Sequence, residues 1–114
     1  MTDEHQAFLS ALRELDRALD QAIESGQTMK CRVNEILQAA QAGRPLRESL
    51  PAEQRPLLVQ LLTQTTELLH AYGNRVRTTE ARALYSEGVT MDEIARLFGV
   101  SRQRVSTLLR SRQD

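Results

Sequence analysis

Hydrophobic residues near the start of the chain recur at alternating intervals of four and three residues. The series consists of Phe8, Leu12, Leu15, Leu19 and Ala22. Such heptad spacing is typical of a helix that packs along a narrow seam, and Thr2 or Asp3 could cap its first turn.

The same spacing continues in phase through Gly26 to Met29, Val33, Ile36 and Ala40. Two interpretations follow: one helix from about residue 3 to residue 42, or a helical hairpin broken at Gly26. We favour the single helix, because a short linker would not usually preserve the phase. A glycine inside a helix costs only about 1 kcal/mol relative to alanine.

Gly43 and Pro45 end this pattern, and we expect residues 43–51 to form a loop. A second amphipathic helix is expected from Leu57, packed antiparallel on the first. Its apolar positions are Leu58, Leu61, Leu62, Leu68, Leu69 and Tyr72. It either ends near Gly73, with a new helix capped by Thr78 or Thr79, or runs through Gly73 without a break. In both cases a supporting helix ends at Gly88.

Residues 88–112 predict two short helices joined by a tight turn. Thr90, with Glu93 three residues later, forms a capping box for the first helix, and Ser101 begins the second. Gly99 provides a residue that can adopt the left-handed conformation between them. The apolar side shared by both helices is expected to contain Ile94, Ala95, Phe98, Val100, Val105 and Leu108.

The pattern I-A-x-x-F-G-V-S followed by V-x-x-L resembles the DNA-binding helix-turn-helix of small bacterial repressors and of region 4 of sigma factors. The resemblance covers about a third of the chain and implies a three-helix domain over residues 73–114. Its second helix, at about residues 101–111, would enter the major groove. A helical hairpin with a structural or protein-binding role is the alternative. We therefore expect an all-α protein in which residues 1–72, a long helix or a hairpin, serve dimerisation.

Charge is distributed unevenly along a chain whose formal net charge is zero. Residues 1–72 carry a net charge of −3 and residues 73–114 a net charge of +3. Between Ile94 and Gln113 there is no acidic residue, and the basic ones are Arg96, Arg102, Arg104, Arg110 and Arg112. A basic helix end suits phosphate groups, although an ordinary solvated basic face has the same composition.

The resemblance assigns roles within the second helix. Side chains off its apolar face would contact base edges: Arg102, Gln103, Ser106 and Thr107. The candidates for phosphate contacts, which set the register without reading sequence, are Thr90, Ser101, Arg104 and Arg110. We expect Val105 and Leu108 to be core residues.

One such module binds DNA weakly, so two copies joined by their front helices are expected to form a homodimer. Their half-sites would lie about one helical turn apart, roughly 34 Å. The predicted dimer interface consists of Phe8, Leu12, Leu15, Leu19, Met29, Val33 and Ile36.

Other classes of function receive little support from the sequence. Cys31 is the only cysteine, and no nucleophile–base set, phosphate loop or metal-ligand cluster is apparent, so we expect neither catalysis nor a cofactor or metal. No apolar run approaches the roughly 18 residues of a membrane span, and a cytoplasmic location is expected. The alternatives are a protein–protein adaptor that, like sigma region 4, docks on RNA polymerase or another protein, and the DNA-binding partner of a toxin. No small-molecule effector can be inferred.

Overall fold

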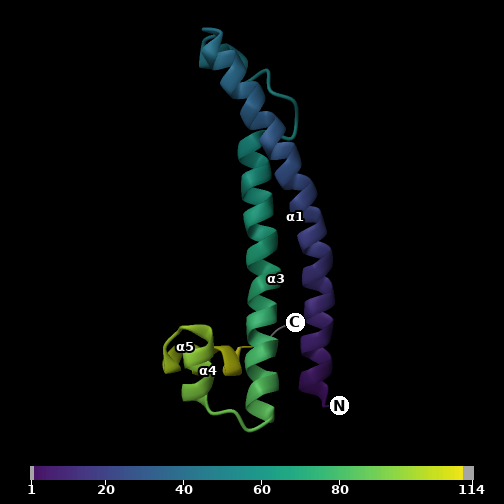
Figure 1. The fold of residues 1–114 in the computed structure, drawn as a ribbon, viewed down its shortest axis with the longest axis vertical. Coiled ribbons are helices and arrows are strands. Elements are labelled where there is room, and N and C mark those ends of the chain that lie inside the picture. Colours follow the sequence, from purple (N-terminus) through teal and green to yellow (C-terminus); the bar gives the residue numbers. More distant parts are fainter. Residues whose placement is uncertain (1, 112–114) are drawn as a thin grey trace. The chain divides into compact units, whose positions relative to one another are not determined.

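The computed structural model describes residues 2–111, and this part of the chain is all-α as predicted (Figure 1). Its helices are α1 (Asp3–Gln41), α2 (Leu46–Ser49), α3 (Leu58–Ser86), α4 (Met91–Phe98) and α5 (Arg102–Arg110). The chain divides into two compact units. Unit 1 contains the residues up to Arg17 and those from His70 onward, and unit 2 contains Ala18–Leu69.

The first helix is continuous through Gly26, which confirms the single-helix interpretation. It ends where the sequence indicates: Gly43 has a φ of 81°. The Gly43 amide donates to the carbonyl of Ala40 at 3.0 Å, and the Arg44 amide donates to the carbonyl of Ala39 at 3.0 Å. The left-handed glycine thus turns the chain while the last carbonyls of α1 keep hydrogen-bond partners.

The segment expected to be a loop contains one turn of helix, α2, so that expectation was wrong in part. Pro45 precedes the turn with a φ of −62°, and its carbonyl accepts bonds from the amides of Glu48 and Ser49 at 3.0 and 3.1 Å. A four-residue helix is too short to show a hydrophobic period, and for this reason the sequence pattern missed it.

The third helix begins with two side-chain caps. Gln60 Oε1 accepts from the Leu57 amide at 2.8 Å, and Glu53 Oε1 accepts from the Leu58 amide at 2.6 Å. The helix then continues through Gly73, which excludes a new helix at Thr78 or Thr79. Both threonines are buried within α3, and Thr79 Oγ1 donates to the Arg75 carbonyl at 2.8 Å.

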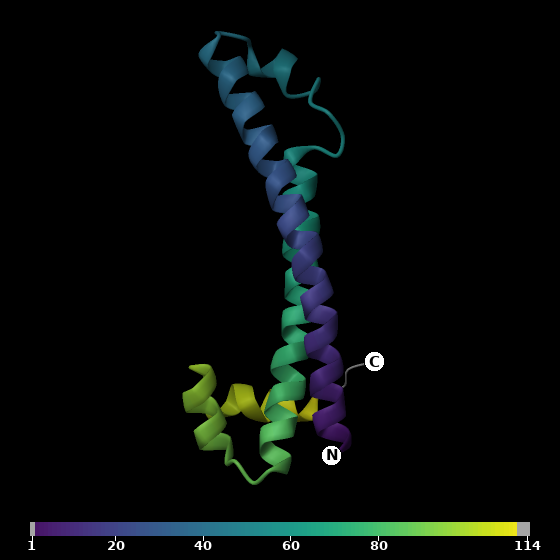
Figure 2. The same ribbon diagram turned by 45° about the vertical axis from the view of Figure 1, so that its right-hand side comes forward.

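In unit 2, the second part of α1 runs antiparallel to the first part of α3 (Figure 2). The most buried side chains here are Ala18, Arg32 and Leu61. Ala18 and Arg32 are two heptads apart, so they lie on the same side of α1. Arg32 approaches Glu35 at 3.9 Å through Nη1, whereas its buried Nε has no hydrogen-bond partner.

Unit 1 combines the first turns of α1, the last turns of α3, and the two short helices α4 and α5. Ala11 is buried at 1% exposure, so α1 approaches the rest of the unit closely there. Two side-chain contacts connect α1 to the C-terminal part of α3 and the residue after it: an ion pair of Glu14 with Arg75, and a hydrogen bond between the His5 ring and the Glu87 carboxylate. This arrangement provides the support on which α4 and α5 are mounted.

Candidate nucleic-acid interface

A small apolar core holds α4 and α5 against the last turns of α3. Ile94 and Val105 have 0% exposure, Leu108 has 3%, and Ala81 of α3 has 0%. Further apolar side chains pack around them: Leu84, Val89, Met91, Phe98 and Leu109. This cluster holds one side of α5 inward, so the other side is left for solvent or a ligand.

Both short helices begin with the predicted N-cap hydroxyl, which is one half of the capping box expected at Thr90. Thr90 Oγ1 accepts from the Glu93 amide at 3.2 Å, and Ser101 Oγ accepts from the Arg104 amide at 3.0 Å. Between the helices, Gly99 adopts the left-handed conformation with φ 69° and ψ 35°. The local sequence therefore determines where α4 ends and where α5 begins.

Four predicted contact residues lie together on the outward side of α5. They are Gln103 and the residues three, four and seven positions after it, Ser106, Thr107 and Arg110. This spacing places them on one helix face. The buried Val105 and Leu108 occupy the opposite side. All four are exposed except Ser106, which is half-buried. This face bears donors and acceptors and one positive charge, with no carboxylate.

Arg102 lies at the edge of that face rather than at its centre. Its Nε is 3.8 Å from Asp92 Oδ1 of α4, and both side chains are about two-thirds exposed (68% and 64%). An exposed pair at this distance contributes little to stability. The carboxylate nevertheless partly neutralises the guanidinium that was predicted to contact a base. The contact between Arg102 and Asp92 was not predicted, because it depends on how α4 and α5 cross.

The predicted phosphate contacts divide into cap hydroxyls and arginines. The hydroxyls of Thr90 and Ser101 accept backbone bonds, and each can still donate its own proton. Arg104 is exposed, and Arg110 is exposed with its Nε directed to the Ser106 carbonyl at 3.3 Å.

Arg96 is also exposed, on α4, so it can add to the positive potential of the module. Arg112 lies outside the described residues.

Thr107 keeps a free acceptor on the outward face of α5. Its hydroxyl donates to the carbonyl of Gln103 at 3.1 Å. Thr107 can therefore still act as an acceptor, and its methyl group remains available for apolar contact.

Comparison with protein-family models, with curated proteins and with solved structures finds no match to this chain. Within residues 2–111, no three His, Cys, Asp or Glu side chains are grouped so that they could hold a metal ion. In the same range, none of the helices has a stretch long and apolar enough to span a bilayer.

Arg77 was not among the predicted contact residues, although it lies beside Arg104. It lines a small hollow of about 140 Å³ together with Glu80, Phe98, Val100, Arg104 and Leu108. Arg77 precedes the buried Ala81 by four residues, so both face α4 and α5. This spacing was visible in the sequence, but its meaning depended on α3 continuing through this region.

Val100 is 39% exposed at the rim of this hollow, so it contributes less to the core than expected.

The structure divides the predicted dimer seam into two groups. Phe8, Leu15, Met29 and Ile36 are half-buried. Leu12, Leu19 and Val33 are exposed, at 38%, 42% and 41%. The heptad pattern of α1 thus contains two neighbouring apolar rows, of which only one is covered within the chain.

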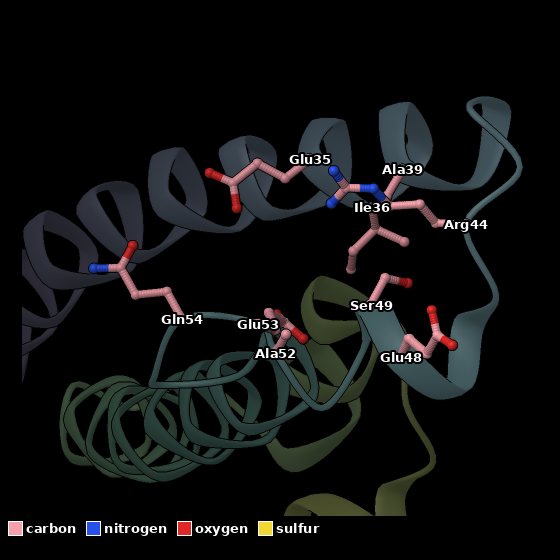
Figure 3. Close-up of a pocket in the computed structure, with 9 residues that line it drawn as sticks. All are labelled: Glu35, Ile36, Ala39, Arg44, Glu48, Ser49, Ala52, Glu53 and Gln54. Carbon is pink, nitrogen blue, oxygen red and sulfur yellow. The ribbon is translucent and has the colours of Figure 1, made fainter.

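A groove of about 500 Å³ in unit 2 was not anticipated from the sequence (Figure 3). It lies between the last turns of α1, with Glu35 and Ile36, and the segment carrying Glu48 and Ser49. Ser49 Oγ is buried there with no hydrogen-bond partner. Of the predicted residues, only Ile36 lines this groove.

Proposed function

We propose that this chain binds double-stranded DNA through α4 and α5, which would act as a helix-turn-helix with α5 in the major groove. The observation that carries this proposal is the outward face of α5. It presents Gln103, Ser106, Thr107 and Arg110 on one side of a helix whose other side is fixed in a core. An exposed helix of this width, polar and without acidic groups, fits the major groove.

Base recognition is assigned to the exposed side chains near the start and middle of α5. Gln103 can pair with adenine through its amide, and Arg102 can pair with guanine once it separates from Asp92. Ser106 and Thr107 provide shorter contacts on the same face. A good bidentate pair adds about 1–3 kcal/mol of discrimination between bases.

Phosphate contacts are assigned to the residues around that face. Arg104 and Arg110 provide charge, and Thr90 and Ser101 provide hydroxyl donors at two helix N-termini, where backbone amides favour anions. Arg77 extends this positive region onto α3.

The chain would act as a homodimer, because one module of this size binds DNA weakly. Two related modules would recognise an inverted repeat, as expected of a bacterial transcription regulator in the cytoplasm. The role is one of binding, with neither catalysis nor a cofactor.

A selection of bound sequences from random DNA, together with a gel shift at several salt concentrations, tests the proposal. We expect wild type to enrich an inverted repeat and to lose affinity steeply as salt rises. Gln103→Ala should relax the preference at one base pair of each half-site. Leu97→Ala, a change of an exposed side chain on α4, should leave the preference unchanged. Absence of salt-sensitive affinity for any DNA would exclude this function.

A protein–protein adaptor is the second candidate, and one observation favours it. Leu97 is 65% exposed on α4, where it could contact a partner such as RNA polymerase. An adaptor would bind its partner through α4 and would show no salt-sensitive affinity for DNA. In that case Leu97→Ala, rather than Gln103→Ala, would weaken the interaction.

A further inference from the structure

One side of unit 2 is apolar but uncovered, and we call it the apolar flank. On α1 it contains Leu19, Ile23, Val33 and Leu37, and on α3 it contains Val59, Leu62 and Leu69. These side chains are between 37% and 64% exposed. One charged side chain lies among these aliphatic residues: Lys30, which is exposed on the same side of α1.

Both helices contribute to the same flank because of how they pack. Leu19 directly follows the buried Ala18, and Leu62 directly follows the buried Leu61. In an antiparallel helix pair, the position after the inward-facing residue lies on the same side of the pair in both helices. The apolar side chains of α1 and α3 are therefore neighbours on one surface.

The opposite side of the pair, which we call the polar flank, has a different composition. Its residues include Gln21, Glu24, Thr28, Glu35, Gln64 and Glu67. No large aliphatic side chain of α1 or α3 occurs there, so within this helix pair the exposed leucine, isoleucine and valine side chains lie on the apolar flank. A helix pair that is apolar on one flank alone is expected to cover that flank.

The area of the apolar flank is consistent with a stable dimer. Seven aliphatic side chains, each about half exposed and each with about 100 Å² of apolar surface in full, present roughly 350 Å². An interface of standard size buries about 800 Å² per partner, of which somewhat more than half is apolar. The flank thus supplies most of the apolar surface that such an interface needs.

The order of residues along α1 supports a second copy of the chain as the occupant. Consider two copies of α1 packed antiparallel with their midpoint at the height of Thr28. Leu19 then faces the second copy's Leu37, and Ile23 faces its Val33. In the same register Gly26 faces the second copy's Lys30. Large aliphatic residues meet large ones, and the long side chain of Lys30 meets a residue without a side chain.

Gly26 has no explanation within the single chain. A Cβ placed there would meet nothing within 4 Å, and glycine is less favourable than alanine inside a helix. In the proposed pairing, however, glycine leaves space for the aliphatic part of the second copy's Lys30 side chain, whose ammonium group then reaches solvent. This explains a glycine at the centre of the apolar flank.

We propose that two copies associate through their apolar flanks to form a four-helix arrangement. Their α1 helices run antiparallel, with the midpoint of the pairing at the height of Thr28. The inference rests on the homodimer of the proposed function, and it does not require DNA binding. It differs from the seam expected from the sequence, because four of the seven residues of that seam are half-buried within the chain.

Sedimentation measurements over a range of concentrations test the association. We expect wild type to be a dimer, and Ile23→Glu with Leu62→Glu to be a monomer of unchanged helix content by circular dichroism. The matched control, Gln21→Glu with Gln64→Glu at two exposed positions of the polar flank, should remain a dimer. A monomeric wild type, or a flank variant that is still a dimer, would overturn the proposal.

Disulfide trapping tests the register. In a Cys31→Ser background, cysteines at Ile23 and Val33 should form a covalent dimer under mild oxidation. Within one helix these positions are about 15 Å apart, which is too far for an internal disulfide. Cysteines at Ile23 and Leu37 should cross-link more slowly, and equal rates for the two pairs would refute the antiparallel register.

Gel shifts with the same variants separate this inference from the proposed function. A monomeric flank variant should keep weak, salt-sensitive DNA affinity. If wild type is a dimer without DNA affinity, DNA binding fails while the association stands.

Discussion

At the scale of single residues, Ile94 and Leu97 show how differently two neighbouring side chains of α4 contribute. Ile94 is fully buried in the core under α5, whereas Leu97 is 65% exposed. Truncating a buried aliphatic side chain removes its burial and leaves a cavity, and truncating an exposed one does neither.

We therefore expect Ile94→Ala to lower the free energy of unfolding by about 2–5 kcal/mol, as measured by urea denaturation. Leu97→Ala should change it by less than about 0.5 kcal/mol, as expected for a surface position. Similar losses for the two variants would mean that α4 does not pack through Ile94.

Asp92 is the residue whose role depends most on the proposed function. Its carboxylate lies near Arg102, so it should repel phosphate and compete with bases for the guanidinium. We expect Asp92→Asn to tighten DNA binding by up to about fivefold, since exposed pairs of this kind contribute about 0.2–1 kcal/mol. Fluorescence anisotropy with labelled DNA would measure this. Glu48→Gln, in the other unit, serves as the control and should have no effect.

At the scale of elements, the turn between α4 and α5 depends on one backbone conformation. Gly99 has a φ of 69°, which costs other L-residues about 1–2 kcal/mol. Gly99→Ala should therefore destabilise the protein by about this amount in thermal or urea unfolding. Gly99→Asn should cost less, because asparagine adopts this conformation more readily. An alanine variant as stable as wild type would contradict this account of the turn.

The start of α5 carries a conflict between stability and binding. Arg104 occupies the position where a capping box would have glutamate, next to the partial positive charge of a helix N-terminus. We expect Arg104→Glu to raise the free energy of unfolding by about 0.5–1 kcal/mol and to weaken DNA binding at least tenfold. Arg104→Gln should be intermediate in both measurements. If Arg104→Glu raised the stability and left the DNA affinity unchanged or tighter, a phosphate contact at this residue would be contradicted.

At the scale of the whole molecule, salt dependence should report the number of modules bound. Arg104 and Arg110 in two copies correspond to about four phosphate contacts, which predicts a slope of log affinity against log salt of about −3.6. The monomeric variant, Ile23→Glu with Leu62→Glu, should show about half that slope. An equal slope for the two proteins would mean that one copy makes all the contacts.

The sequence alone determined the features that depend on local chemistry. Thr90 and Ser101 cap helices through bonds to amides three residues away, and Gly43 and Gly99 adopt left-handed conformations that other residues disfavour. The uninterrupted heptad phase likewise predicted the single helix α1. Each of these follows from interactions within about one turn of the chain or from a regular period.

Which surfaces remain uncovered depends on how the helices pack against one another. Leu15 and Leu19 have the same chemistry and adjacent places in the heptad pattern, yet one is half-buried and the other exposed. The pairing of Arg102 with Asp92 and the place of Arg77 beside α5 likewise depend on how helices cross. A period of apolar residues shows that a helix has an apolar side. Which part of that side is covered depends on contacts between residues distant in sequence, which no local pattern encodes.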